Sequence, residues 1–195
     1  MASITRSIAA ACAIMFASTA AYAADCTTDK TDPFELDEAE VVSLYDCIQG
    51  KMIAGYTKGD NEVAKAYRDW TVTATRAAVA GPHGERLLLT FANDIAAEQY
   101  LKFAEEGVEM PAGSVLAKES AKLNKKKKAV VVGPLFIMTK MEAGSIPETN
   151  DWLYGGVLPN GKPMKFKQSF CHNCHVGWEE QDSLAYPLEE VRITN

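Results

Sequence analysis

The stretch Trp70-Thr71-Val72-Thr73-Ala74-Thr75 marks the point where the sequence changes from helical to strand periodicity. The run alternates and is rich in β-branched residues, which is typical of a strand. Residues 86–91 predict a second strand, and Gly81-Pro82-His83-Gly84 supplies the connection between the two. A connection this short joins antiparallel neighbours. The sequence therefore begins a β-rich region here.

Three more strands are expected after this point, over residues 114–120, 130–141 and 152–158. Gly133-Pro134 must bulge or break the middle one, because proline donates no hydrogen bond to a neighbouring strand. Pro159-Asn160-Gly161-Lys162 predicts the turn that follows the last strand. With helices on both sides, the pattern predicts an α+β fold with a single antiparallel sheet of about five strands.

The expected helices flank the strands. Asp37 caps the first helix with Glu40 as its capping-box partner, and Gly55 lies near its end. Its buried stripe consists of Val41, Leu44, Ile48 and Met52. A short second helix is expected over residues 61–67, and Asn93 or Asp94 caps another that reaches about Glu106.

The N-terminus reads as a secretory signal. Arg6 precedes an apolar stretch that ends at the A-x-A site Ala21-Tyr22-Ala23, so residues 1–24 are expected to be cleaved. The stretch is too short for a convincing membrane span, and no later segment is long enough. Residues 25–66 then form an extended arm with helices, and residues 67–195 form the main domain. The mature protein is expected to be exported and soluble.

The charge balance argues against nucleic acid as a partner. The chain has 20 basic and 26 acidic residues, a net charge of −6, and loss of the signal makes it more negative. Lys125 to Lys128 is a local exception. This run is either a docking patch for an acidic redox partner or a solvated loop between two strands, and we favour the loop.

Cysteine usage agrees with export. Cys12 lies in the signal, and Cys26 and Cys47 form an even pair outside the C-terminal motif. A Cys26–Cys47 disulfide is expected in an oxidising compartment. The alternative is two unpaired thiols.

The run Cys171-His172-Asn173-Cys174-His175 has the C-x-x-C-H pattern that attaches a c-type haem. Cys171 and Cys174 would each form a thioether to a haem vinyl group, and His175 would be the axial ligand of the iron. His172 is expected to point away as a solvent-facing residue. Chance, or a C-x-x-C redox pair, is the alternative, but a redox pair needs no trailing histidine. One covalently attached haem c per chain is therefore the predicted cofactor.

An ordered set of short motifs resembles the cytochrome P-460 family, which includes the cytochromes c′-beta. The set covers about residues 67–190 and includes the C-x-x-C-H run. It comprises Tyr67-Arg68-Asp69-Trp70, Asn93-Asp94 with Tyr100, Gly113 to Glu119, Met138-Thr139-Lys140, Ile146-Pro147, Asp151 to Tyr154, Asp182 and Tyr186-Pro187. The resemblance implies a periplasmic homodimer whose haem packs against the sheet, with five-coordinate iron and His175 as the proximal ligand.

The resemblance also implies two chemistries. P-460 members carry a lysine joined to the haem and oxidise hydroxylamine, with nitric oxide, to nitrous oxide, whereas c′-beta members bind gases such as nitric oxide. Lys118 matches the cross-linking lysine, with Lys140 as the fallback. A buried amine is more readily deprotonated, as such a link requires. Arg86 loosely matches a family arginine near the haem, and Trp152 is expected to pack beside it.

The region expected opposite His175 departs from the hydroxylamine-oxidising pattern. That chemistry needs a base near the iron, yet Leu135-Phe136-Ile137-Met138 contains no acid. Phe136 over the iron would make a dry pocket suited to diatomic gases, although it could equally be an ordinary core aromatic.

Three functions stay open at this stage. The first, which we favour, is a haem protein with an open iron site that binds or transforms small nitrogen oxides. The second is a hydroxylamine-oxidising enzyme with a Lys118–haem link. The third is a six-coordinate electron carrier, for which Met138, Met141 and Met164 are candidate ligands.

Overall fold

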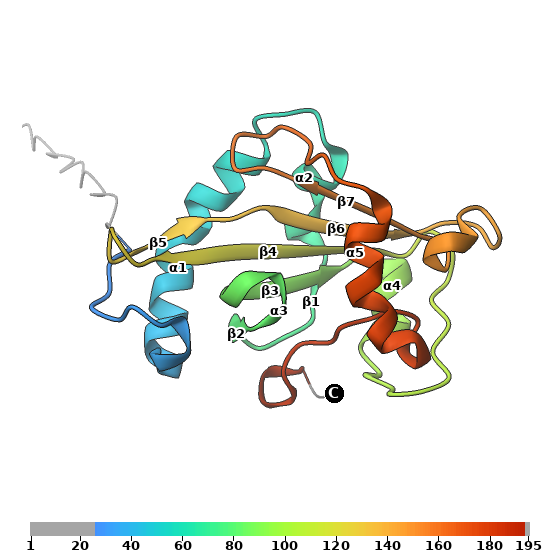
Figure 1. The fold of residues 1–195 in the computed structure, drawn as a ribbon, viewed down its shortest axis with the longest axis horizontal. Helices are drawn as coiled ribbons and strands as arrows, with labels where there is room; N and C mark the ends of the chain where they lie inside the picture. The colour runs from blue at the N-terminus through green and yellow to red at the C-terminus, as the bar shows by residue number, and fades with distance from the viewer. Residues whose placement is uncertain (1–25, 194–195) are drawn as a thin grey trace, which may run out of the picture.

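The computed structural model describes residues 26–193 and contains one antiparallel sheet (Figure 1). Its seven strands are β1 (Thr71–Val72), β2 (Ala78–Ala80), β3 (Arg86–Ala92), β4 (Val115–Asn124), β5 (Ala129–Val132), β6 (Leu135–Lys140) and β7 (Trp152–Val157). The main path runs β1-β3-β4-β6-β7, with β2 also paired to β3 and β5 also paired to β4. The expected α+β class with a single antiparallel sheet is confirmed.

Five α-helices surround the sheet in the described part of the chain. They are α1 (Glu38–Tyr56), α2 (Glu62–Ala66), α3 (Pro82–Glu85), α4 (Asp94–Tyr100) and α5 (Gln168–His175). Short 3-10 helices cover Pro33–Glu35, Tyr67–Asp69, Pro147–Thr149, Val176–Gln181 and Glu189–Val191. In Figure 1, α1 passes behind the sheet and α5 crosses in front of it, so the two helices cover opposite faces.

Local signals predicted several boundaries. The Asp37–Glu40 capping box is present at the start of α1, and the break at Gly133-Pro134 separates β5 from β6. Both strands pair with β4, one with each of its halves. Lys125 to Lys128 lies in the turn between β4 and β5, as the loop interpretation predicts.

Other boundaries were wrong. The sheet has seven strands where about five were expected, because β2 was missed and the single strand expected over residues 130–141 is divided into β5 and β6. The strand expected over residues 71–75 is only two residues long, and it gives way to single backbone contacts such as the Thr75 N–H to Val191 carbonyl bond of 2.8 Å. Helix α4 ends at Tyr100, well before Glu106. Phe103 already has φ 47°, a left-handed conformation that a helix does not continue through.

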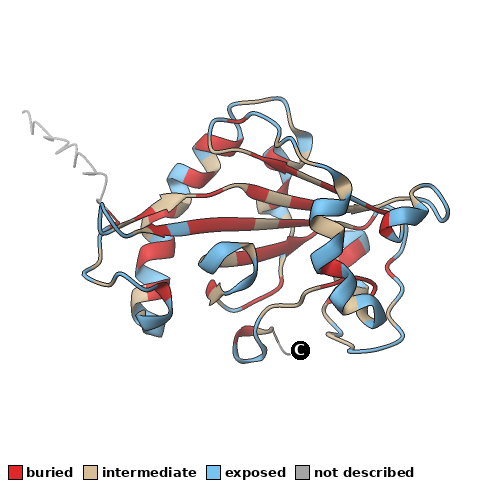
Figure 2. Cartoon of the chain, viewed as in Figure 1, coloured by how far each residue is buried: buried red, intermediate tan, exposed pale blue. Residues whose placement is uncertain are grey.

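The two faces of the sheet have different coverings. Residues on one face, among them Phe91, Ala117 and Ile137, pack with α1 and its buried stripe into the larger core. Leu116 and Trp152 belong to a second buried cluster around α4. Figure 2 shows the central strands largely buried and α1 striped with buried and exposed residues, as an amphipathic covering helix should be.

The arm before α1 is fastened to the edge of the sheet. Cys26 and Cys47 form the expected disulfide, with their Cα atoms 5.5 Å apart. The Thr28 N–H also donates to the Lys128 carbonyl at 2.9 Å. The predicted signal, residues 1–24, lies outside the described residues. Within residues 26–193, no helix has the length and apolar character needed to cross a membrane.

Candidate haem site

Helix α5 presents the C-x-x-C-H residues to one cavity. Positions three and four apart lie on the same side of a helix, so Cys171, Cys174 and His175 all line that cavity. Neither cysteine is in a disulfide. Burial, together with the neighbouring Cys174, raises the pKa of the Cys171 thiol. Helix α5 therefore offers two unoxidised thiols and one imidazole at the same wall.

The His175 ring is buried and held by one hydrogen bond. Its Nδ1 lies 2.8 Å from the Ser183 carbonyl oxygen, which can only accept, so Nδ1 carries the proton and Nε2 keeps its lone pair. Burial lowers the pKa of His175, which also favours the neutral ring. A neutral imidazole oriented through its second nitrogen is the usual state of a histidine that ligates a metal. The sequence did not identify this partner.

The Ser183 carbonyl is positioned by its neighbour Asp182. The Asp182 carboxylate is buried and accepts from the Met110 N–H at 2.8 Å and from Lys140 Nζ at 2.7 Å. Trp152 Nε1 donates to the Asp182 backbone carbonyl at 2.8 Å. Asp182 and Ser183 both have a left-handed backbone, with φ 52° and 63°. This network fixes a turn that a free chain would rarely adopt.

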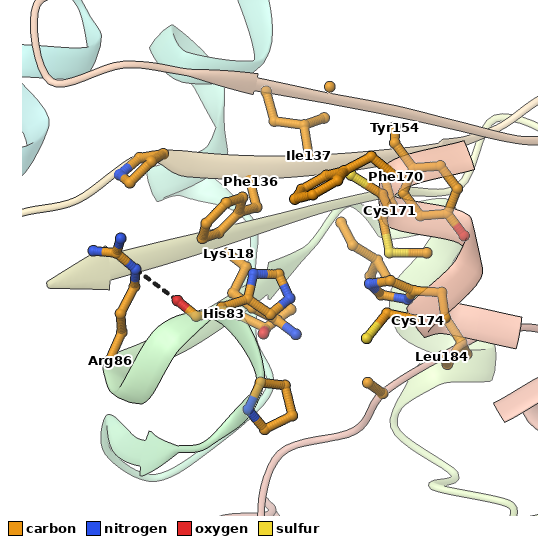
Figure 3. Close-up of a pocket in the computed structure, with 18 of the residues that line it drawn as sticks. His83, Arg86, Lys118, Phe136, Ile137, Tyr154, Phe170, Cys171, Cys174 and Leu184 are labelled. Carbon is orange, nitrogen blue, oxygen red and sulfur yellow. Dashed lines mark hydrogen bonds between the residues drawn. The ribbon is translucent and has the colours of Figure 1, made fainter. Parts of the chain in front are cut away.

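The cavity has a volume of about 550 Å³ and lies between α5, the sheet and α3 (Figure 3). Two rows of paired residues contribute to its sheet wall: Thr90, Lys118 and Phe136 in one, and Leu116, Met138 and Tyr154 in the other. Most of the lining is apolar, and among the described residues it includes no Asp or Glu. Cavities that bind organic cofactors have this size and character.

Lys118 points into the cavity, an orientation that the sequence left unproven. Burial lowers the pKa of its amine to about 8. No hydrogen bond or ion pair to another described residue accompanies this burial. A desolvated lysine without a counterion is the form in which an amine becomes nucleophilic.

His83 is the cavity residue that sequence reasoning missed. It lies on α3, in the stretch interpreted only as a connection, and its ring centre is 4.3 Å from that of Phe136. The Arg86 Nε donates to the His83 carbonyl at 2.7 Å. Arg86, an expected haem neighbour, also lines the cavity. Burial and the nearby Lys118 lower the pKa of His83 to about 3. The ring is therefore neutral.

The remaining candidates divide into two groups. Met138 and Met164 line the cavity, whereas Met141 does not. The fallback Lys140 is bonded to Asp182 outside the cavity. His172 also lies outside it, with Nδ1 3.4 Å from the Tyr154 hydroxyl. Trp152 is fully buried and packs in the second core cluster, outside the cavity lining.

The residues present fit a haem. The cavity volume, the apolar walls, the two thiols and the oriented His175 lie together on the sheet face opposite α1. Cys171 and Cys174 would hold the porphyrin edge, and His175 would bind the iron. A bound haem would supply an iron centre for ligand binding or electron transfer.

This fold and site define the class as a small haem protein. The model of the cytochrome P-460 family matches residues 64–185, well over half of the chain. The chain therefore belongs to the cytochrome P-460 family, which confirms the resemblance seen in its motifs. A search of curated proteins finds no match.

Proposed function

We propose that this protein is a periplasmic c-type cytochrome that binds small nitrogen oxides, nitric oxide first among them. Cys171 and Cys174 attach one haem covalently, and His175 ligates its iron from the α5 side. The ligand enters the part of the cavity between the iron and the wall formed by His83 and Phe136. The homodimer and the redox partner that the family resemblance implies stay predictions.

One observation carries the choice of ligand: the cavity contains no carboxylate among its described lining residues, and Phe136 and Met138 add apolar surface to its sheet wall. An apolar site offers little to a charged or strongly hydrated substrate but accommodates an uncharged diatomic gas. Arg86 and Lys118 make the lining electropositive, which disfavours a cationic substrate further.

Titration of the reduced protein with nitric oxide tests this proposal. We expect stoichiometric binding with a shift of the Soret band. His83→Gly removes a ring from the cavity wall and so makes room for a ligand. If nitric oxide changes neither the spectrum of the intact protein nor that of this variant, the proposal is wrong. Mass spectrometry of the exported protein should also show one haem per chain and an N-terminus at Ala24 or Asp25.

The second candidate function is hydroxylamine oxidation, and the burial of Lys118 in the cavity favours it. A covalent link to the haem edge would need this amine to be unprotonated, and its pKa of about 8 brings that state within reach of neutral pH. The haem peptide should then carry Lys118 by mass spectrometry, and Lys118→Ala should lose the link. Turnover of hydroxylamine that disappears in the variant would favour the enzyme over the gas-binding protein.

A further inference from the structure

The His83 ring faces His175 across the cavity. Figure 3 shows His83 beside Phe136 and Lys118, on the opposite side of the cavity from Cys171 and Cys174. The centres of the two imidazole rings are 6.2 Å apart. Within residues 26–193, no hydrogen bond occupies either nitrogen of the His83 ring. Its lone pair is therefore uncommitted.

This ring separation suits two ligands on one iron. A metal–imidazole nitrogen bond is about 2 Å long, and the ring centre lies roughly 1 Å beyond, so two axial imidazoles have centres about 6 Å apart. His175 keeps its own Nε2 lone pair because Nδ1 is bonded to Ser183. Phe136 packs on His83 at 4.3 Å and restricts the ring.

The backbone that delivers His83 is unusual. His83, Gly84 and Glu85 follow one another with φ of 66°, 79° and 54°. Two of these are side-chain-bearing residues in the left-handed region, and such conformations cluster at ligand-binding sites. The Arg86 bond to the His83 carbonyl and the Glu85 N–H bond to the Gly81 carbonyl, 3.2 Å long, hold the turn closed. The turn places the His83 ring inside the cavity.

We propose that His83 is the second axial ligand of the haem iron in the resting protein, and that a small ligand must displace it to bind. In that exchange one iron–nitrogen bond to His83 breaks and one bond to the incoming nitric oxide forms, without loss of a proton or an electron. The inference rests on the haem site proposed above. It changes the expected open iron site into one that is closed by a displaceable histidine.

The test compares three holoproteins: the wild type, His83→Gly and Glu85→Gly. Glycine tolerates positive φ, so both variants should keep the turn, and only the first loses a ring. Glu85 is exposed and does not line the cavity, which makes Glu85→Gly the matched control. Absorption and electron paramagnetic resonance spectra of the ferric proteins report the spin state.

We expect a low-spin bis-imidazole spectrum in the wild type and in Glu85→Gly, and a high-spin spectrum in His83→Gly. Added imidazole should return the His83→Gly protein to the low-spin state. If His83 occupies the iron in most molecules, the apparent affinity for nitric oxide is the intrinsic affinity multiplied by the fraction of molecules in which His83 is detached. Nitric oxide should therefore bind the variant ~10-fold or more tightly than the wild type.

Two results would overturn the inference. One is a high-spin wild type, because the site would then be open. The other is a low-spin spectrum that survives in His83→Gly, because a methionine such as Met138 or Met164 would then be the ligand. Failure of nitric oxide to bind either protein would instead reject the proposed function and leave the spin-state result standing.

Discussion

Lys118 and Glu119 are consecutive residues of β4, yet the protein treats their charges in opposite ways. Glu119 has no exposed surface and faces α1, where the hydroxyls of Tyr45 and Tyr67 donate to its carboxylate and Arg68 Nη1 lies 3.2 Å away. Lys118 faces the cavity with its amine buried and unpartnered among the described residues. On the α1 face, protein side chains therefore pair with the buried Glu119 carboxylate. On the cavity face, no described residue pairs with the Lys118 amine.

This difference separates structure from function. A buried charge without a partner destabilises a fold, so such a group persists where something other than the protein meets it. Burial and the Glu119 carboxylate raise the pKa values of Tyr45 and Tyr67, which keeps both hydroxyls protonated as donors. The Glu119 cluster is complete and holds α1 on the sheet. The described residues form no such cluster around Lys118, and the haem proposed above would occupy the cavity that its amine faces.

The largest expected effect follows from breaking the complete side. Glu119→Ala removes the acceptor of two tyrosines and leaves Arg68 without its partner, so the free energy of unfolding should fall by about 3–5 kcal/mol. Lys118→Met, the matched change on the adjacent residue, loses no protein partner and removes a buried unpartnered charge, so at neutral pH it should raise the free energy of unfolding by about 1–3 kcal/mol. Urea unfolding of the two variants measures both values. Equal losses would show that the two faces do not differ in this way.

Asp182 is a buried carboxylate with protein donors, and it tests whether such a group can both stabilise the fold and influence the haem site. Like Glu119 it is buried and accepts from several protein donors, but it lies next to the Ser183 carbonyl that orients His175. Asp182→Asn removes the ionic partner of Lys140 and should lower the free energy of unfolding by about 1.5–3 kcal/mol.

Asp182→Asn should also raise the reduction potential of the iron, because a weaker Nδ1–H bond makes His175 a less basic ligand. Redox titration of the holoprotein measures this potential. Glu119→Gln, on the far face, is the control whose potential should stay unchanged. A loss of stability in Asp182→Asn without any change in potential would make Asp182 purely structural.

Sequence reasoning succeeded where a local rule decides the outcome. Backbone hydrogen-bond donors decide the Asp37–Glu40 capping box and the break at Gly133-Pro134, and both are visible in a few residues. The oxidising compartment expected from the N-terminal signal predicts the Cys26–Cys47 disulfide. The C-x-x-C-H run is equally local, since Cys171, Cys174 and His175 share one face of α5, but their attachment of a haem stays a prediction.

The parts that failed depend on tertiary context. Both faces of β4 are buried, so alternation alone could not tell which of Lys118 and Glu119 faces the cavity. His83 was overlooked because Gly81-Pro82-His83-Gly84 reads as a turn, and turns usually face solvent. A signal did exist: histidine adopts positive φ more often than most side-chain-bearing residues, and the Gly84 that follows it permits positive φ freely.

The smallest expected effect concerns the titration of Lys118. Its amine has a pKa of about 8 in the folded protein against 10.5 when exposed. Between these values the unfolded chain holds more protons, so stability should rise with pH. Relative to Lys118→Met, the wild type should gain on the order of 1 kcal/mol per pH unit in this window and be level below it. A Lys118 amine joined to the haem would not titrate, and the difference would stay constant with pH. Urea unfolding of both holoproteins from pH 7 upward therefore distinguishes a free amine from a cross-linked one.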